Sequence, residues 1–512
     1  MKRFLKIVFS RFVIVSLLIL VQLALLFVVA VRFTEYFVFY YFLSLLVAFL
    51  LTLKIVNRKD IAEYKIAWIV TVLLIPVFGS ALYIIFSGNR LTEHTKRKMS
   101  EITGSMRNTL PVNPDVLSAL EERDPGVACQ SRYIANVAQC PPFQNTSVRY
   151  FPLGEDMFPV FLEELRRAEK YIFLEYFIIA EGQMWNAILE ILTQKAAEGV
   201  DVRVIYDDMG CITRLPSQYP KKLAALGIRC QVFNRFIPVL SARLNNRNHR
   251  KIGVIDGKVA FTGGINLADE YINAEVRFGH WKDNAVMLRG DAAWSMTVMF
   301  LTMWDYLAHA GTVAETYDHY RPADAVPEEA CSGFVQPYTD NPLDNEPVGK
   351  TIYLNMINRA KRYVYITTPY LIIDDLLETA ICNAAKSGVD VRIITPHIGD
   401  KFFVHETTKS YYRHLIESGV KVYEYTPGFI HAKTFVCDDA YATVGTVNLD
   451  FRSLYLHFEC GVWMYGVDEI SAIKEDFAVT EAKCKQITLA DCTGGFWRNL
   501  LREVMVLIAP MM

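Results

Sequence analysis

The apolar positions of the chain are concentrated near its N-terminus. Residues 12–31 form an apolar run with only two polar interruptions, and a second run occupies residues 36–53. About 20 apolar residues are enough for an α-helix to cross the hydrocarbon core of a bilayer, whereas a secretory signal would have a shorter apolar core. We therefore expect two membrane helices at these positions, joined in a tight hairpin.

A third apolar segment, residues 65–89, contains Pro76 and Gly79 near its middle. Because proline removes a backbone donor and breaks or kinks a helix, the segment is either a kinked third span or a helix–break–helix that dips into the membrane and returns. Lysine and arginine residues cluster before the first run, after the second run and after the third segment. Basic flanks stay in the cytoplasm, which favours the returning form and places the rest of the chain in the cytoplasm.

The pattern changes character at about residue 146. Apolar strand-like runs now alternate with helical stretches, which is typical of α/β units. Residues 166–179 resemble residues 358–371, and residues 199–210 resemble residues 388–399, in the same order along the chain. The sequence therefore predicts a duplicated α/β part.

These changes divide the chain into five expected parts. They are a membrane anchor, a linker without a strong period, two α/β halves and a C-terminal amphipathic helix, at residues 1–90, 91–145, 146–325, 326–490 and 491–512. The last part has apolar residues spaced for one helix face, with Arg498 and Arg502 beside it. Such a helix either lies in a membrane interface or packs on the domain, and both alternatives remain open.

A third repeated element contains side chains that can take part in catalysis. Each copy has histidine, any residue, lysine, four residues, aspartate, and then a glycine-containing turn with an asparagine. The copies are His249, Lys251, Asp256 and Asn266, and His431, Lys433, Asp438 and Asn448. One copy alone is a weak signal, but two copies inside a tandem repeat are hard to produce by chance. The repeat therefore marks a functional site.

Composition narrows the choice of function. The net charge of −2 lacks the basic excess that is typical of nucleic-acid-binding proteins, so we expect no nucleic-acid partner. The ten cysteines occur singly, without a CxxC pair, and a secreted disulfide framework would be denser. We expect reduced thiols, and Cys437 as a small core residue on a strand.

The two His-Lys-Asp motifs are similar to those of the phospholipase D superfamily, over about residues 146–490. The apolar N-terminus, the segment AWIVTVLLIPVFGSALYIIFSGN and the strand LEYFII also resemble the bacterial cardiolipin synthases. The resemblance implies a tandem pair of phospholipase D-like α/β sandwich domains that share one active site, preceded by a transmembrane helical region. It implies transfer of a phosphatidyl group between phosphatidylglycerol molecules, with release of glycerol, in the inner membrane of a bacterium.

Phosphodiester chemistry explains the residue types. Alternation along a strand places the histidine and lysine of each motif on one face. One neutral imidazole can attack phosphorus to form a phosphohistidine, and the other can protonate the leaving alkoxide and later deprotonate the incoming hydroxyl. The lysines and asparagines can hold the nonbridging oxygens, so this scheme needs no metal and no cofactor. By resemblance, His249 is the nucleophile and His431 the acid and base.

Other functions are also compatible with the two motifs. Phosphatidylglycerol, phosphatidylethanolamine and water all fit as acceptor, so a phospholipase or another phosphodiesterase is the alternative. An inactive membrane scaffold is disfavoured because both motifs are complete. The second copy has Gly445-Thr446 where the first has Gly263-Gly264, and small residues suit that turn. The oligomeric state is open.

The carboxylates near the histidines have different expected roles. Asp256 and Asp438 lie five residues after the motif lysines, on the opposite strand face, and we expect them to hold the strand and turn. An imidazole nucleophile needs a carboxylate at its other nitrogen. Asp283 and Glu459 each begin an apolar run after the asparagine turn. We expect Asp283 to pair with His249 and Glu459 with His431, the alternative being that both are surface carboxylates.

Overall fold

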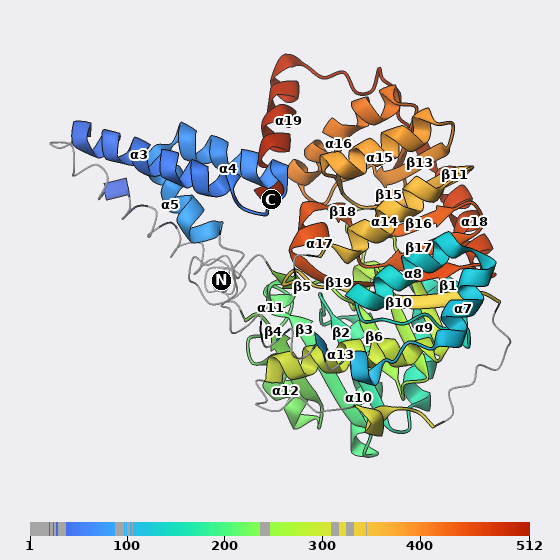
Figure 1. The fold of residues 1–512 in the computed structure, drawn as a ribbon. Helices are drawn as coiled ribbons and strands as arrows, with labels where there is room; N and C mark the ends of the chain where they lie inside the picture. The colour runs from blue at the N-terminus through green and yellow to red at the C-terminus, as the bar shows by residue number, and fades with distance from the viewer. Residues whose placement is uncertain are drawn as a thin grey trace.

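A computed structural model shows the arrangement of the chain (Figure 1). Besides isolated positions between residues 20 and 104, it describes residues 37–87, 106–235, 246–308, 317–323, 332–344 and 346–511. The first expected membrane helix, residues 12–31, lies outside the described residues apart from isolated positions.

The described part of the N-terminal region contains three helices, α3 (Phe37–Val56), α4 (Ala62–Leu74) and α5 (Pro76–Phe86). Proline is tolerated at the first position of a helix but not in its interior, and Pro76 accordingly begins α5. The rings of Trp68 and Tyr83 lie 5.4 Å apart, whereas 15 residues of continuous helix would separate them by about 22 Å. Helix α5 therefore folds back on α4, which favours the helix–break–helix interpretation over the kinked span, and the place of this segment in a membrane stays a prediction.

Gly79 permits the close approach of the two helices. A Cβ atom on this residue would lie 2.2 Å from the carbonyl oxygen of Thr71, so only glycine fits here without a shift of the backbone. Among the helices in the described part of the chain, none combines the length and the apolarity that a membrane crossing requires.

The stretch expected to be a linker includes the helices α7 (Pro114–Arg123) and α8 (Pro125–Val137). Each begins with proline after a capping residue: Asn113 accepts from the N–H of Asp115, and Asp124 from the N–H groups of Gly126 and Val127. Such cap-and-proline pairs are helix start signals. Helix α8 is joined to the second half, since the side-chain amide of Gln336 donates to the carbonyls of Ser131 and Cys140.

The first half is a seven-stranded sheet in the order β1-β9-β7-β6-β2-β3-β4. Its strands are β1 (Thr146–Phe151), β2 (Tyr171–Tyr176), β3 (Asp201–Asp207), β4 (Arg229–Phe233), β6 (Ile252–Ile255), β7 (Val259–Gly263) and β9 (Ala285–Gly290). Its helices are α9 (Gly154–Arg167), α10 (Gln183–Ala197), α11 (Asp208–Cys211), α12 (Tyr219–Ala225) and α13 (Ala292–Ala308).

The second half repeats this order as β10-β19-β17-β16-β11-β13-β14 and adds β20 at the edge. Its strands are β10 (Phe334–Asp340), β11 (Tyr363–Thr367), β13 (Asp390–Pro396), β14 (Lys421–Tyr425), β16 (Thr434–Cys437), β17 (Tyr441–Gly445), β19 (His457–Tyr465) and β20 (Cys484–Gln486). Its helices are α14 (Val348–Arg359), α15 (Asp375–Lys386), α16 (Phe402–Glu417), α17 (Phe451–Tyr455) and α18 (Ile470–Glu481). The equivalent strand orders confirm the predicted duplication of an α/β unit.

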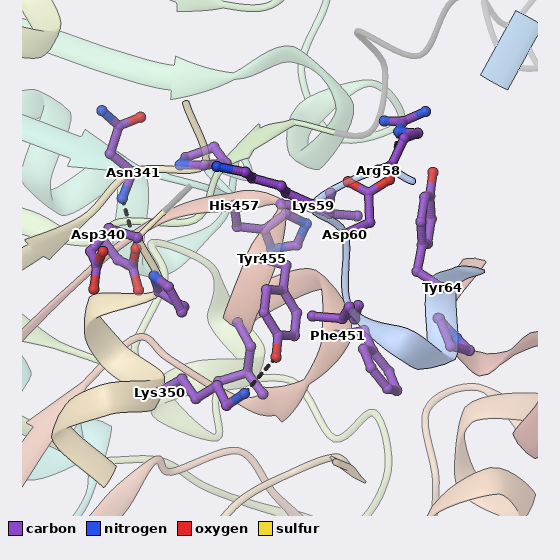
Figure 2. A pocket seen from close by; sticks show the side chains of 17 residues that line it. Arg58, Lys59, Asp60, Tyr64, Asp340, Asn341, Lys350, Phe451, Tyr455 and His457 are labelled. Carbon is purple, nitrogen blue, oxygen red and sulfur yellow. Dashed lines mark hydrogen bonds and ion pairs between the residues drawn. The ribbon is translucent and has the colours of Figure 1, made fainter. Parts of the chain in front are cut away.

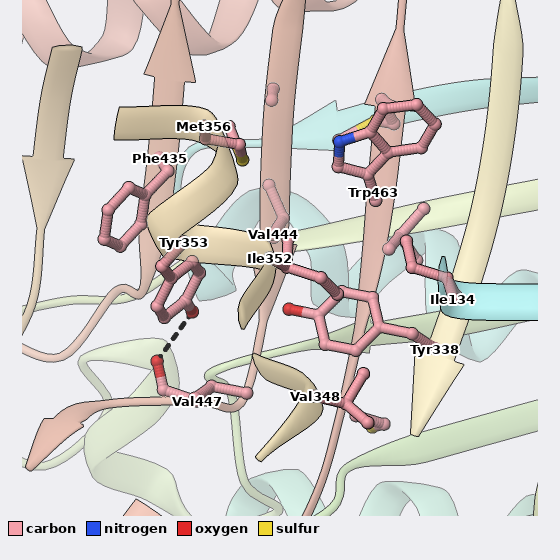
Figure 3. Packing of buried hydrophobic residues seen from close by; sticks show 14 of the residues in the cluster. Ile134, Tyr338, Val348, Ile352, Tyr353, Met356, Phe435, Val444, Val447 and Trp463 are labelled. Carbon is pink, nitrogen blue, oxygen red and sulfur yellow. Dashed lines mark hydrogen bonds between the residues drawn. The ribbon is translucent and has the colours of Figure 1, made fainter. Parts of the chain in front are cut away.

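One hydrophobic core runs through both halves. Helix α13 is apolar nearly all round and is buried from Ala292 to Trp304, as expected of a helix enclosed on every side. In the second half, Tyr353 stacks on Phe435 with ring centroids 3.9 Å apart and donates its hydroxyl to the carbonyl of Val447 (Figure 3). Buried Cys437 on β16 belongs to this core, as predicted. The two sheets are therefore held in one fixed relation.

Helix α19 (Phe496–Ile508) docks through its polar side. Arg498 and Arg502 both donate to the buried carboxylate of Glu406 on α16, and Arg498, together with Arg502, holds the pKa of Glu406 at about 2. Phe496 and Trp497 are 73% and 78% exposed. The helix thus packs on the domain and also turns apolar side chains outward, and its place in a membrane interface stays a prediction.

Substituting Glu406→Gln should release α19. The neutral amide cannot balance two guanidinium groups, so trypsin should cleave after Arg498 and Arg502 several-fold faster than in the wild-type protein. The matched control is Glu417→Gln on the same helix, which removes an exposed ion pair with Arg413 of little energetic value. Equal cleavage rates in all three proteins would mean that other contacts hold α19.

Candidate active site

Each motif histidine lies on a segment that joins a strand of the opposite half. Strand β5 (Arg247–Asn248) pairs in parallel with the start of β19, and the N–H of His249 donates to the carbonyl of Phe458 at 2.9 Å. Strand β15 (Gly428–Ile430) pairs in the same way with β8 (His280–Lys282), and the N–H of His431 donates to the carbonyl of Lys282 at 2.7 Å. Both histidines therefore sit at the interface between the halves.

The imidazoles pair with carboxylates across this interface. His249 Nδ1 lies 2.9 Å from Glu459 Oε2, and His431 Nδ1 lies 2.6 Å from Asp283 Oδ2. The two carboxylates were predicted correctly, but the predicted partners were wrong. In the first half, β7 separates β6, which follows His249, from β9, which follows Asp283. In the second half, β17 separates β16, which follows His431, from β19, which carries Glu459. A carboxylate therefore cannot reach the histidine of its own half, and the opposite half supplies it.

This geometry leaves the Nε2 atom of each ring available for reaction. A carboxylate at Nδ1 favours the tautomer in which Nδ1 carries the proton and Nε2 is free. Burial lowers the pKa of His249 to about 3 and that of His431 to about 4. Both rings are thus neutral near pH 7 in the ligand-free protein, as a nucleophile must be. A phosphate anion bound between them would favour protonation of one ring.

The two motif lysines supply the positive charge of the site. Lys251 and Lys433 are each 1% exposed, and burial lowers their pKa values to about 8 and about 7. Lys251 donates to the carbonyl of His249 at 2.5 Å, and Lys433 donates to that of His431. Neither has an ion-pair partner among the described residues. A buried ammonium without a counter-ion is costly, so this site is suited to an anion.

The motif aspartates act on the backbone, as predicted. The carboxylate of Asp256 accepts the N–H groups of Glu169, Lys170 and Tyr171, each at 2.8 Å. Asp438 accepts three N–H groups in the equivalent place, those of Lys361, Arg362 and Tyr363 at 2.7–2.9 Å. Both aspartates have positive φ, 54° and 56°. They fix the turn after each motif strand against the start of the neighbouring strand.

Of the two asparagines expected to donate to the phosphate, Asn266 is engaged in other contacts, and the role of Asn448 stays a prediction. Asn266 accepts from the N–H of Ile178 at 2.9 Å and donates its amide to the hydroxyl of Tyr271 at 2.7 Å. Its side chain is therefore already engaged in holding a loop and Tyr271, whose ring centroid lies 5.6 Å from that of His431. The Oδ1 atom of buried Asn448 has no partner among the described residues.

Sequence reasoning missed the residues that hold the two carboxylates. Glu459 accepts from the hydroxyls of Thr446 and Ser453. At the position equivalent to Thr446 the first half has Gly264, where a Cβ atom would lie 2.0 Å from Asp283 Oδ1. The difference between Gly263-Gly264 and Gly445-Thr446 was the available signal. It reflects a shorter carboxylate beside glycine in one half and a longer one beside threonine in the other.

His457 was also missed. It precedes Glu459 by two residues, as Trp281 precedes Asp283, and each of these rings lies 5.6 Å from the motif histidine that the carboxylate holds. Among the described residues, His249, His457 and Glu459 form the one group that could hold a metal ion, with their ligand atoms within 4.8 Å of one another. Two of the three already form the imidazole–carboxylate pair.

The crossed pairing predicts which histidine each carboxylate controls. Glu459→Gln should alter the imidazole ¹⁵N resonances of His249, and Asp283→Asn those of His431, because each amide no longer fixes the tautomer. Turnover should fall about 10²- to 10⁴-fold in each variant with the fold retained. ¹⁵N NMR of histidine-labelled protein measures the first effect. A response of the histidine in the carboxylate's own half would contradict the crossing.

Asp256→Ala should act on stability and not on chemistry. It leaves three backbone N–H groups without their acceptor, so the free energy of unfolding should fall by about 2–4 kcal/mol. Thermal unfolding measures this loss, and turnover below the transition should stay near the wild-type value. Asp438→Ala is the internal comparison, because its three contacts are equivalent. A large loss of turnover with an unchanged melting temperature would refute the structural role.

Comparison with known proteins agrees with this geometry. Residues 161–291 and 353–480 match the family model described as cardiolipin synthase, PLD-like domain, and residues 45–88 match a phospholipase D-nuclease N-terminal model. In the solved phosphatidylserine synthase of Haemophilus influenzae, 98% of the chain aligns with 75% of this one, with a TM-score of 0.58 and 14% identity. That likeness concerns the fold alone.

Relatives of similar length include named and unnamed proteins. An uncharacterized protein of Streptococcus mutans is 43% identical over 90% of this chain and 99% of its own length. The cardiolipin synthase of Geobacillus kaustophilus is 34% identical over 83% of this chain and 84% of its own. Cardiolipin synthase 2 of Bacillus anthracis is 33% identical over 84% and 83%. This chain belongs to the cardiolipin synthase family of phospholipase D-like proteins.

Proposed function

We propose that this protein is a cardiolipin synthase, a phosphatidyltransferase that converts two phosphatidylglycerol molecules into cardiolipin and glycerol. One structural observation carries the proposal. Two neutral imidazoles, each oriented by a carboxylate of the opposite half, meet at one interface with two buried lysines that have no ion-pair partner among the described residues. This arrangement fits a phosphodiester, and the family narrows it to a phospholipid.

In the first step, His249 Nε2 attacks the phosphorus of one phosphatidylglycerol. The bond from phosphorus to the glycerol oxygen breaks, and protonated His431 donates its Nε2 proton to that oxygen, so that glycerol leaves. The product is a phosphatidyl-histidine at His249, whose positive charge Glu459 offsets. Lys251 and Lys433 stabilise the nonbridging oxygens as charge grows on them.

In the second step, the terminal hydroxyl of another phosphatidylglycerol attacks the same phosphorus. His431 Nε2 takes the hydroxyl proton, and the bond from phosphorus to His249 breaks, which releases cardiolipin and restores both rings. Asp283 stabilises the imidazolium that forms at His431 in this step. The protonation with which the first step began, neutral His249 and protonated His431, is thereby recovered.

The surroundings of the site support a lipid substrate. Phe496 and Trp497 on α19 point outward, and the same is true of Leu53, Val56 and Leu74 in the N-terminal helices. Contiguous exposed apolar side chains typically mark a membrane or partner surface. We place the protein at the inner membrane of a bacterium, with residues 1–90 as a multi-pass anchor and the catalytic part in the cytoplasm.

Lipid analysis tests the proposed function. The full-length enzyme in vesicles that contain phosphatidylglycerol alone should form cardiolipin and glycerol in equal amounts. His249→Ala and His431→Ala should each lower the rate by about 10³-fold or more, and an acid-quenched reaction should leave the phosphatidyl group on His249. Phosphatidic acid without cardiolipin would make the enzyme a phospholipase, and an adduct on His431 would reverse the two roles.

A further inference from the structure

A cavity lies between the N-terminal helices and the second half of the catalytic part, apart from the reacting phosphate. Its volume is about 260 Å³, whereas a single water needs about 10–15 Å³ on the same measure. Three distant segments enclose it: the loop after α3, the loop after β10, and the turn from α17 into β19 (Figure 2). Pro510 at the C-terminal end completes the wall. A cavity of this size can hold a small polar headgroup.

The two halves differ at the position of His457, which lines the cavity. In the first half, Trp281 fills the equivalent place and packs on Tyr271 and Phe429, with ring centroids 4.9 and 4.8 Å away. In the second half the residue at this position is His457, which lines the cavity. The two halves therefore differ at this position. The first half has the indole of Trp281, and the second half has the imidazole of His457 at the cavity wall.

Among the described residues His457 has no hydrogen-bond partner, and its one ion-pair contact there is with Glu459. Its side chain is 10% exposed, and neither ring nitrogen makes a hydrogen bond within the described part of the chain. The nearest carboxylate oxygen, Glu459 Oε1, lies 3.6 Å from Nδ1, beyond hydrogen-bond distance. Buried polar groups are normally paired, so an imidazole at a cavity wall indicates that a ligand supplies the partner.

The charges around the cavity favour an anion at its mouth. Arg58 pairs with Asp60 at 2.7 Å, and Lys350 pairs with Asp374 at 2.5 Å. Lys59 is exposed, has no ion pair among the described residues, and lines the cavity as His457 does (Figure 2). Burial raises the pKa of Asp340 on the opposite wall well above its usual value, which reduces the negative charge there.

We propose that this cavity binds the glycerol-phosphate headgroup of an anionic phospholipid, as a second lipid site beside the one that reacts. Lys59 contacts the phosphate, and His457 bonds to a glycerol hydroxyl. The bilayer is the source, because Leu53 and Val56, which lead into the loop of Lys59, are 46% and 54% exposed and can lie against acyl chains. The headgroup thus joins the N-terminal helices to the strand that carries Glu459.

Binding to a protein that cannot turn over tests the site directly. In full-length His431→Ala, calorimetry with soluble dihexanoyl phosphatidylglycerol should give two equivalents bound. Adding Lys59→Glu or His457→Phe should remove one equivalent or weaken it about tenfold. Lys54→Glu is the matched control, since Lys54 is an exposed lysine at the end of α3 that does not line the cavity. Two unchanged equivalents in both cavity variants would overturn the proposal.

Soluble glycerol 3-phosphate separates the two possible sources of the headgroup. It should compete weakly, because it lacks the chains that lie along α3, and equal affinity for both probes would overturn the assignment to a lipid. In the active enzyme, Lys59→Glu should raise the KM for phosphatidylglycerol several-fold and leave kcat near wild type. An unchanged KM would count against the second site, whereas the proposed function would fail only if no cardiolipin formed.

Discussion

The crossing of the two imidazole–carboxylate pairs is the interaction on which the site depends. His249 takes its carboxylate from β19 of the second half, and His431 takes its carboxylate from the loop after β8 of the first. A charge-assisted hydrogen bond of this kind contributes about 1.5–3 kcal/mol, but its larger effect is geometric. Neither imidazole is oriented unless both halves are docked, so catalytic competence and docking are one event.

Burial gives this arrangement its chemical character. Two lysines, two histidines and two carboxylates lie in a region that is almost closed to solvent. Burial disfavours the charged forms of the lysines and histidines. Burial alone would also raise the pKa of Asp283, but the neighbouring His431 and Lys433 charges hold it below its usual value. The charged forms of Lys251 and Lys433 are therefore disfavoured by burial, and a bound phosphodiester stabilises them.

The sequence was informative wherever a property is local or repeated. The internal repeat revealed the α/β halves and both motifs. Strand alternation correctly predicted that Asp256 and Asp438 point away from the histidines. The carboxylate that pairs with each histidine could not be predicted in this way. The pairing depends on the order of strands in each sheet, in which β7 and β17 lie between strands that are close in the chain. Helices α7 and α8 were missed although Asn113 and Asp124 precede prolines, since short helices without a strong apolar period resemble loops. The sequence did not identify His457 as a site residue, because only its equivalence to Trp281 distinguishes it from other histidines.

Because of the crossed pairing, two halves are the smallest unit that can form a complete active site. A half produced alone would hold a histidine and a carboxylate that cannot meet, so an ancestral single-copy protein with this strand order would need a second copy to finish either pair. In such a symmetric pair every substitution would appear twice. Joining the copies in one chain removes that constraint, and the divergence of Gly264 from Thr446 and of Trp281 from His457 is the kind of change that covalent linkage permits.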